Sequence, residues 1–341
     1  MEEARLDTVV NGGLTWINLG RPTRNTMEKE LASRGYHFHE LNIEDCLSKR
    51  QIAKVDKHSD YIFILFHFPS HLHTGTTAIS TKKRARRDHP SNLLHFSQLS
   101  IFAGWNFVVT VHQGDLQPLN DLFYQCKANS DQRNELMGKT SGYLLHTIID
   151  VLVDDLFHMM MKIIGNLDDI EDAVFDDKIG VVKEISLLRR EIVLLRRIVT
   201  PLKRIVSEVT NDIQKFSEED LTQYFNDVED HVNKVLEVLE SSRETIEIYK
   251  DTDFMLGAEK TNRILAMLTI WFTLSIPPVA IGTFYGMNVN LPGGIEIGPW
   301  TFLGTYTTLI IVLIMSAVFT LAMYLYFIKV GWLTTSIRIR K

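Results

Sequence analysis

Two long apolar runs dominate the C-terminal part of the chain. They cover residues 264–284 and 302–328, and between Arg263 and Lys329 the only formally charged side chain is Glu296. A helix needs roughly 20 apolar residues to cross the hydrocarbon core of a bilayer, and a core helix of a soluble protein rarely runs this long without a charge. The pattern predicts two transmembrane helices, joined by a loop at residues 285–301.

The segment before the first span shows only helical periodicity from about Asn134. We expect an antiparallel helical pair over residues 131–216 and a stalk helix over residues 217–263 that continues into the first span. Acidic side chains near the end of the first helix and basic ones along the second are expected to pair with each other. Apolar residues of the stalk recur at four- and three-residue steps, which predicts packing on the helical pair or on copies of the stalk: Val228, Val232, Val235, Leu239, Ile246, Tyr249 and Leu256.

The N-terminal segment, residues 1–130, mixes strand-like and helical patterns. Residues 14–19 and 61–68 are rich in β-branched and aromatic side chains, and residues 26–35 read as a helix that ends at Gly35. The stretch from Leu99 to Gly114 predicts a β-hairpin that turns near Gly104. These signals indicate an α/β or α+β domain.

Composition hides this division. The chain has 341 residues, of which 45% are hydrophobic and 23% charged, with a formal net charge of -6. Nearly all the charge lies before the first span, so a cytoplasmic part and a membrane part are expected. Cys46 and Cys126 are too few for a disulfide or zinc framework and are interpreted as packing residues.

The distribution of basic residues predicts the topology. Lys260 and Arg263 precede the first span, a basic tail at residues 329–341 follows the second, and the loop between them contains no Lys or Arg. By the positive-inside rule both termini face the cytoplasm, in a multi-pass protein of the cell (inner) membrane. The first ten residues lack the pattern of a cleaved signal peptide, so none is expected.

A second stripe crosses the first span and mixes polar with apolar residues. Taken alone it fits a water-lined pore and ordinary helix packing equally well. Its members recur at helical spacing: Asp251, Met255, Ala258, Asn262, Leu265, Thr269, Phe272, Ile276, Ala280 and Thr283.

The loop favours the pore. Tyr285, Gly286, Met287 and Asn288 stand at the outer end of the first span and resemble the YGMN signature of the CorA family of divalent-cation (Mg²⁺/Co²⁺) channels. The stalk segment that contains Asp227-Val228-Glu229-Asp230-His231 resembles the DVxDH segment of that family. The resemblance covers residues 140–332 and implies a funnel-shaped homopentamer in which the first spans surround one pore.

The resemblance implies a selectivity filter at Tyr285–Asn288. Mg²⁺ dehydrates reluctantly, so a ring of neutral Asn288 carbonyl groups suits the hydrated ion. Gly286 permits the sharp turn, while Tyr285 and Met287 hold the ring. Below it, the apolar residues of the first span form a constriction that gates by dewetting, and its polar residues rehydrate the ion. The expected pore-lining and gate residues are Asn262, Leu265, Leu268, Thr269, Ile276 and Thr283.

Regulation is expected on the stalk. The resemblance implies that Asp227 and Asp251 bind regulatory cytoplasmic Mg²⁺, with the partner carboxylate of Asp227 coming from a neighbouring subunit. Bound ion would bridge carboxylates that otherwise repel, and would hold the pentamer closed. Transport is expected to be passive influx driven by the membrane potential, since the sequence offers no Walker-type loop for a nucleotide.

Other readings remain open at this point. A zinc transporter of the ZntB type shares the architecture, and a membrane-anchored scaffold or sensor would need only the hairpin. His67, His71 and His73 are a weak candidate for a transition-metal site, and the basic stretch from Lys82 to Pro90 is interpreted as a solvated loop. No enzymatic activity and no nucleic-acid partner are expected; the expected partners are divalent ions, the lipid bilayer and further copies of the chain.

Overall fold

A computed structural model describes residues 4–48, 51–70, 95–175, 181–217, 219–287, 292 and 298–332. The chain divides into two compact units, Met1–Asp251 and Thr252–Lys341. A single helix, α7 (Thr222–Gly286), belongs to both units. The candidate spans lie in the second unit.

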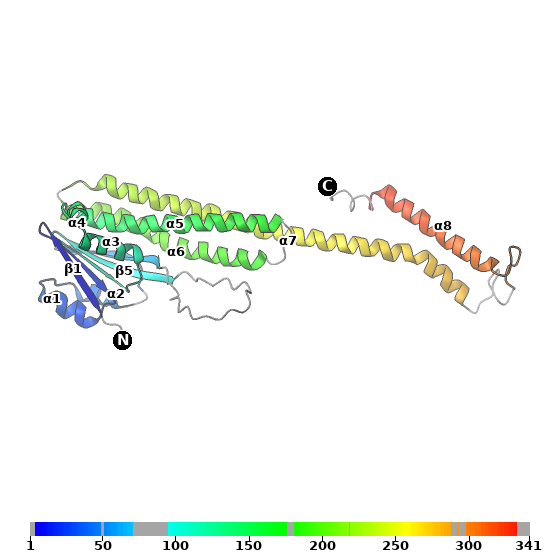
Figure 1. The fold of residues 1–341 in the computed structure, drawn as a ribbon, viewed down its shortest axis with the longest axis horizontal. Coiled ribbons are helices and arrows are strands. Elements are labelled where there is room, and N and C mark those ends of the chain that lie inside the picture. The colour runs from blue at the N-terminus through cyan, green and yellow to red at the C-terminus, as the bar shows by residue number, and fades with distance from the viewer. Residues whose placement is uncertain are drawn as a thin grey trace. The chain divides into compact units, whose positions relative to one another are not determined.

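A six-stranded mixed sheet forms the centre of the N-terminal domain (Figure 1). The strand order is β1-β2-β6-β5-β4-β3, and every neighbouring pair is antiparallel except β2 and β6, which are parallel. The expectation of an N-terminal α/β domain is confirmed. The strands are β1 (Arg5–Asn11), β2 (Leu14–Gly20), β3 (Lys54–Lys57), β4 (Tyr61–Ser70), β5 (His95–Gly104) and β6 (Phe107–His112).

The predicted hairpin at Gly104 is confirmed as the turn from β5 to β6, with Ala103 paired to Val108. A Cβ atom at Gly104 would lie 2.4 Å from Cε1 of Phe107 and 2.9 Å from the carbonyl oxygen of Asp60. Neither distance is sterically possible for a side chain. Glycine is therefore required at this turn by close packing.

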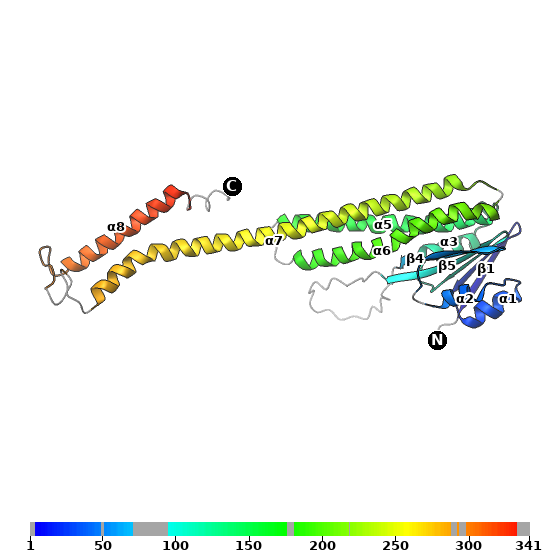
Figure 2. The ribbon, with the colours of Figure 1, turned by 180° about the vertical axis from the view of Figure 1, so that it is seen from behind.

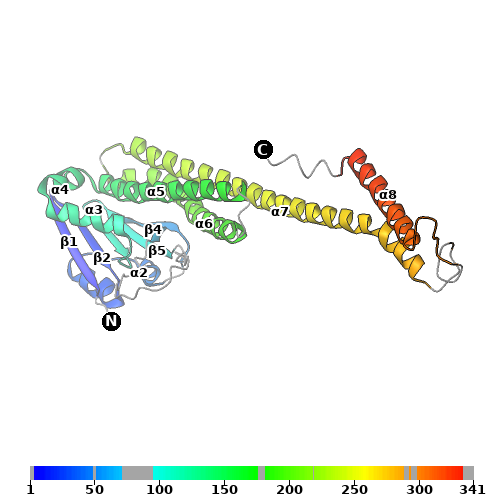
Figure 3. The ribbon, with the colours of Figure 1, turned by 45° about the vertical axis from the view of Figure 1, so that its right-hand side comes forward.

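One face of the sheet is covered by the segment between β2 and β3. This segment contains a π-helical turn (Thr26–Glu30), α1 (Leu31–Ser33) and α2 (Glu40–Leu47). Its apolar side chains pack with the side chains of β4 and β6 that point to this face. The lower layer visible in Figure 3 is therefore held by hydrophobic burial.

The opposite face is covered by helices that follow β6 in the chain. They are α3 (Gln117–Ala128), α4 (Ser130–Met137), α5 (Ser141–Phe175) and α6 (Val181–Ile213). Trp16 of β2 packs edge-to-face on Phe123 of α3, with 4.9 Å between the ring centroids. The result is an α/β/α arrangement. Alternate residues of the central strands point to opposite faces of the sheet, and each face has its own hydrophobic core.

The helical pair packs with the first part of α7, as Figures 1 and 2 show. Five of the seven predicted stalk positions are buried there, which confirms that the stalk packs on the preceding helices. Tyr249 is only partly buried and Leu256 is exposed. The five buried positions are Val228, Val232, Val235, Leu239 and Ile246.

Two arginines on the basic face of α6 form ion pairs with α7. Nε of Arg189 lies 2.8 Å from a carboxylate oxygen of Glu247, and Nη1 of Arg196 lies 3.0 Å from one of Glu240. Between described residues these two arginines thus pair with α7 and not with α5, while Asp176 and Asp177 of the expected acidic set lie outside the described residues. These pairs are part-exposed, so each contributes at most about 1 kcal/mol.

The second unit contains the remainder of α7 and α8 (Thr307–Val330). Helix α7 remains helical through Pro277 and Pro278 and bends in its C-terminal part (Figure 1). Proline removes backbone donors and commonly bends a helix. Helix α8 ends where Gly331 adopts a left-handed conformation (φ 85°) and its N–H donates to the carbonyl of Ile328.

Candidate functional site

A cluster of two carboxylates and an imidazole lies where α5 packs on α7. Asp150 and Asp154 are one helical turn apart on α5, and His231 faces them from α7. One ligand atom from each of these three residues lies within 4.8 Å of the others. We call this the α5–α7 cluster. Asp227 precedes His231 by one turn, which places it on the same side of α7.

The imidazole of His231 has a ring nitrogen that is available to bind a metal ion. Its Nδ1 atom lies 4.0 Å from Oδ1 of Asp154, which is too long for a hydrogen bond. Nδ1 is buried and has no hydrogen-bond partner among the residues that the structure describes. The ring packs edge-on against Phe157, with 5.4 Å between the centroids. A buried ring nitrogen without a partner is costly unless something else binds it.

The charges around the cluster favour a cation. Burial raises the pKa of Asp150 above its ordinary value; the carboxylates of Asp154 and Asp227 raise it further, while His146 and His231 oppose them. Burial lowers the pKa of His146, against the attraction of Asp150 and Asp227. Crowded carboxylates repel one another, and a bound cation would relieve that repulsion.

The donor set indicates which cation fits. Carboxylate oxygens suit Mg²⁺ as well as transition metals, but an imidazole nitrogen suits Co²⁺, Ni²⁺ or Zn²⁺ better than Mg²⁺. With metal–ligand bonds of about 2.1 Å, two ligand atoms of an octahedral ion are about 3.0 Å apart when adjacent and about 4.2 Å apart when opposite. The three groups, which lie within 4.8 Å of one another, would move closer together on binding an ion. Asp150, Asp154 and His231 therefore fit a divalent transition metal, with Asp227 beside them.

Sequence reasoning missed Asp150 and Asp154. Their signal is a pair of acids four residues apart within an otherwise apolar stretch of α5, between buried residues such as Ile149 and Val153. That signal does not say which helix lies opposite. Asp227 and Asp251, the predicted regulatory residues, are both exposed on α7.

The predicted pore-lining residues all lie on α7 and are exposed to the surroundings of the single chain. Leu265 is 55% exposed and Ile276 is 58% exposed. The window of α7 that includes the first span has a mean hydropathy of 2.0 with 0% of it buried; for α8 the values are 2.4 and 6%. Both helices are long and apolar enough to cross a membrane. The other exposed predicted residues are Asn262, Leu268, Thr269 and Thr283.

The predicted filter begins at the last turn of α7. Tyr285 and Gly286 close the helix, and the hydroxyl of Tyr285 donates to the carbonyl of Pro292 over 3.4 Å. The N–H of Met287 donates to the carbonyl of Phe284 at 3.3 Å, and the side chain of Met287 is exposed. Asn288 lies outside the described residues.

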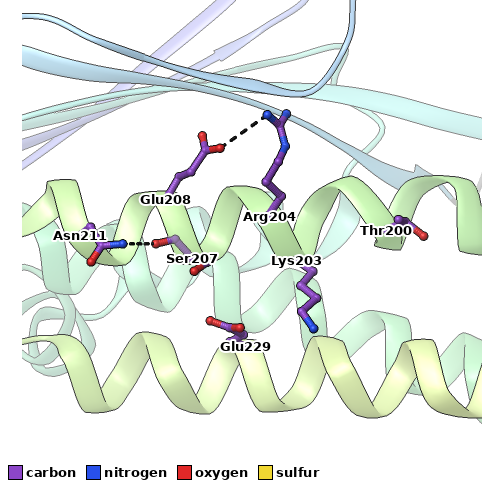
Figure 4. Close-up of a pocket in the computed structure, with 7 residues that line it drawn as sticks. All are labelled: Thr200, Lys203, Arg204, Ser207, Glu208, Asn211 and Glu229. Carbon is purple, nitrogen blue, oxygen red and sulfur yellow. Dashed lines mark hydrogen bonds and ion pairs between the residues drawn. The ribbon is translucent and has the colours of Figure 1, made fainter.

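A shallow groove of about 380 Å³ runs between α6 and α7 (Figure 4). Lys203 and Arg204 line it from α6, together with Glu208, and Glu229 lines it from α7. Arg204 and Glu208 form an ion pair at 3.5 Å. Two cations and two carboxylates balance, so the groove offers no preference for a charged ligand.

The candidate histidine site near β4 is not assembled in the described part of the chain. His67 lies on β4, where burial lowers its pKa. His71 and His73 lie outside the described residues, as does the basic stretch from Lys82 to Pro90.

Known proteins that resemble this chain include metal-ion transporters. The family model of CorA-like Mg2+ transporter proteins matches residues 11–329. The cobalt/magnesium transport protein CorA of Thermotoga maritima is 26% identical over 324 residues, which cover 94% of this chain and 83% of that protein.

Solved structures share the fold. The CorA magnesium transporter of Methanocaldococcus jannaschii superposes with a TM-score of 0.73 at 17% identity, covering 94% of this chain and 91% of that one. The cytoplasmic domain of ZntB from Vibrio parahaemolyticus gives a TM-score of 0.54 at 12% identity, covering 72% of this chain and 88% of that one. The family model matches nearly the whole sequence, and its range of residues 11–329 includes both candidate spans. The chain belongs to the CorA-like Mg²⁺ transporter family.

Proposed function

We propose that the protein is a homopentameric channel for passive influx of hydrated Mg²⁺, and of Co²⁺ and Ni²⁺, driven by the membrane potential. The observation that carries this proposal is α7, which has no buried residue in its most apolar window in one chain and which ends at Tyr285 and Gly286, just before Met287. Exposed apolar surface of this extent needs lipid or further copies of the chain. Five copies would place the polar stripe of each α7 around a common axis.

The stripe then acts as the conduit. A ring of Asn288 side chains holds the hydrated ion at the outer mouth, supported by Tyr285 and Met287. Rings of Leu265, Leu268 and Ile276 form a hydrophobic constriction that opens by wetting. Neutral oxygens for the ion's water shell come from a ring of Thr283 above the constriction, a ring of Thr269 within it and a ring of Asn262 below it.

The membrane potential supplies the driving force. A divalent ion that crosses 100 mV, inside negative, gains about 4.6 kcal/mol, twice the value for a single charge. Both termini are placed in the cytoplasm, with residues 285–301 outside and the basic tail at residues 329–341 inside. The cytoplasmic part then comprises residues 1–130, the helical pair at 131–216 and the stalk at 217–263.

Regulation is assigned to carboxylates of the stalk. Asp227 and Asp251 are exposed in the single chain. Residues that contact a neighbouring subunit are necessarily exposed when that subunit is absent. Asp227 lies beside the α5–α7 cluster, whose residues would hold a divalent metal. Cytoplasmic ion bound there reduces repulsion between carboxylates and stabilises the closed stalk, which gives negative feedback.

A zinc transporter of the ZntB type is the second candidate. The imidazole in the α5–α7 cluster favours a transition metal at that site, and the ZntB cytoplasmic domain shares the fold. A scaffold without transport is the third. Uptake of Mg²⁺ into proteoliposomes, in competition with Co²⁺, Ni²⁺ and Zn²⁺, separates the three: Mg²⁺ uptake inhibited by Co²⁺ and Ni²⁺ supports the proposal, uptake of Zn²⁺ alone favours the second candidate, and no uptake favours the third.

A further inference from the structure

A second imidazole with an unused nitrogen lies next to the α5–α7 cluster. His146 is on α5, one helical turn before Asp150, and only 8% of its surface is exposed. Its Nδ1 atom is buried and has no hydrogen-bond partner within the described part of the chain. Burying a polar atom without a partner costs free energy. The imidazole of His146 therefore has room for a ligand that the cluster does not already account for.

The other ring nitrogen of His146 is held by the first turn of α7. The backbone carbonyl of Tyr224 accepts a hydrogen bond from the imidazole, and since Nδ1 has no partner, the donor is Nε2. Nδ1 then carries a lone pair. Histidines that bind metals commonly donate one ring N–H to a carbonyl and turn the other nitrogen to the ion. Edge contacts with Tyr224 and Phe225, at 5.3 and 5.6 Å between centroids, hold the ring further.

Helices α5 and α7 lie side by side and run in the same direction (Figures 1 and 2). Successive contacts between them advance by nearly the same number of residues on each helix. These contacts are His146 with Tyr224, Asp154 with His231 and Glu171 with Tyr249. In this register Asp150 and Asp227 stand at the same level, one turn beyond His146.

The charges near His146 favour a cation. Burial lowers the pKa of His146, and the carboxylates of Asp150 and Asp227 act against that effect, so both lie close enough to influence the ring. One ammonium group is also near: Nζ of Lys139, which lies 3.7 Å from the centroid of the Tyr143 ring. Two carboxylates outweigh one ammonium group, and the surroundings of the ring are negative.

We propose that His146, Asp150 and Asp227 form a second ion position in this helix interface, which takes Co²⁺, Ni²⁺ or Zn²⁺ in preference to Mg²⁺. Two ligands four residues apart on a helix can bind one metal ion. Asp154 lies eight residues, or about 12 Å, beyond His146, so the ion of the α5–α7 cluster is a different one. Asp150 lies between the two positions and has a carboxylate oxygen for each.

The second position is less compact than the cluster in the ion-free chain. Its three donors do not all lie within 4.8 Å of one another, as those of the cluster do. Asp227 is exposed, so its side chain can rotate toward the ion. The imidazole sets the preference, because nitrogen suits transition metals better than Mg²⁺.

The consequence for the protein rests on the regulatory role proposed above for Asp227. With an imidazole among the ligands, Co²⁺ or Ni²⁺ holds α5 and α7 together at lower concentrations than Mg²⁺ does. Regulation of the stalk then responds to transition metals as well as to Mg²⁺.

Equilibrium dialysis of the full-length protein in detergent against Co²⁺ tests the proposal, with the thermal unfolding midpoint as a second readout. His146→Phe keeps an aromatic ring beside Tyr224 and Phe225 and removes the nitrogen. The variant should bind one fewer Co²⁺ per chain at a concentration that saturates the wild type. Its midpoint without metal should stay close to that of the wild type, and its rise with Co²⁺ should be smaller, whereas the rise with Mg²⁺ should change little. His146→Gln carries the same expectation if the phenylalanine variant does not fold.

Two comparisons complete the experiment. His158→Phe makes the same change at an exposed imidazole of α5 and should bind Co²⁺ as the wild type does. The double variant of His146→Phe with His231→Gln should lose two ions per chain, because the positions are separate. An unchanged Co²⁺ count in His146→Phe would show that His146 only packs, and loss of a single ion in the double variant would contradict a second position. Neither readout measures uptake, so failure here leaves the proposal of a channel intact.

Discussion

Nδ1 of His231 on α7 lies 4.0 Å from Oδ1 of Asp154 on α5, across a packed helix interface. The distance leaves the two groups near each other without a hydrogen bond, although Nδ1 is buried. Asp150 completes the cluster from one turn earlier on α5. A divalent metal bound by this cluster would therefore link the stalk helix α7 to α5.

The first prediction concerns the metal preference of this cluster. Co²⁺ should raise the heat-unfolding midpoint of the wild type, because a ligand that binds only the folded state stabilises it, by about 2.7 kcal/mol at 100 times its Kd. His231→Gln removes the nitrogen ligand and should reduce the Co²⁺ effect more than the Mg²⁺ effect. The measurement is the unfolding midpoint as a function of each ion.

His158→Gln is the matched control for that experiment. His158 is an exposed imidazole one turn beyond Asp154 on α5, and its Nδ1 lies 3.2 Å from the backbone carbonyl oxygen of Asp154. It should leave the Co²⁺ response unchanged. An equal Co²⁺ response in wild type and His231→Gln would show that the cluster does not bind metal through the imidazole.

The second prediction concerns regulation by Asp227. Mg²⁺ at millimolar concentration should protect the stalk from limited proteolysis, since neutralised carboxylates hold the stalks together. In Asp227→Asn the protection should require a higher Mg²⁺ concentration. Glu229→Gln is the control because Glu229 faces the groove with α6. Identical protection curves for wild type and Asp227→Asn would shift the assignment to Asp251.

The secondary structure of the stalk and the spans follows from local sequence, and so does the stalk face that packs. Val228, Val232 and Leu239 are buried as their spacing predicts. Strand β3 was not predicted, because Lys54–Lys57 is polar and becomes a strand through pairing with the apolar β4. Strand β1 was missed for a related reason, since only three of its seven residues are apolar and it is held by antiparallel pairing with β2.

The features that could not be predicted from the sequence depend on contacts between segments that are distant in the chain. The sequence places charges on α6, but it does not say that Arg189 pairs with Glu247 of α7. The α5–α7 cluster has the same origin: acids and imidazole lie on separate helices, and only the packing of those helices brings Asp150 to His231. The expected filter residues were identified from the resemblance to the CorA family. The pattern of polar and apolar residues along the first span fits a water-lined pore and ordinary helix packing equally well.

The third prediction concerns the oligomer. A single α7 would expose Asn262 and Thr269 to lipid, whereas a ring of five turns them toward water. Native mass measurement of the detergent-solubilised protein should therefore give five copies. A monomer or dimer that persists at high protein concentration is incompatible with the pore.

The fourth prediction concerns pH and His112. Burial lowers the pKa of this histidine to about 4, whereas an unfolded chain has a histidine pKa of about 6.5. Between these values the unfolded state binds more protons than the folded state, so folding stability falls as the pH falls from about 6.5 toward 4. The loss attributable to His112 is about 1.4 kcal/mol for each pH unit.

His112→Gln isolates this effect from other groups that titrate in the same range. The variant loses the hydrogen bonds of the imidazole to Asn18 and Gly114, so it should be less stable at pH 7. Its unfolding midpoint should then fall less steeply with acid than that of the wild type. Parallel curves for the two proteins would mean that folding does not lower the pKa of His112.

Voltage-dependent uptake in proteoliposomes tests transport itself most directly. With the membrane potential set by a potassium gradient and valinomycin, wild-type protein should admit Mg²⁺ when the interior is negative and much less when the potential is zero. Asn288→Ala should assemble normally and lose uptake or ion preference, because the ring of neutral carbonyl groups is gone. Uptake at the same rate with and without a membrane potential would contradict a channel driven by the potential. Wild-type uptake and ion preference in Asn288→Ala would contradict a filter at Asn288.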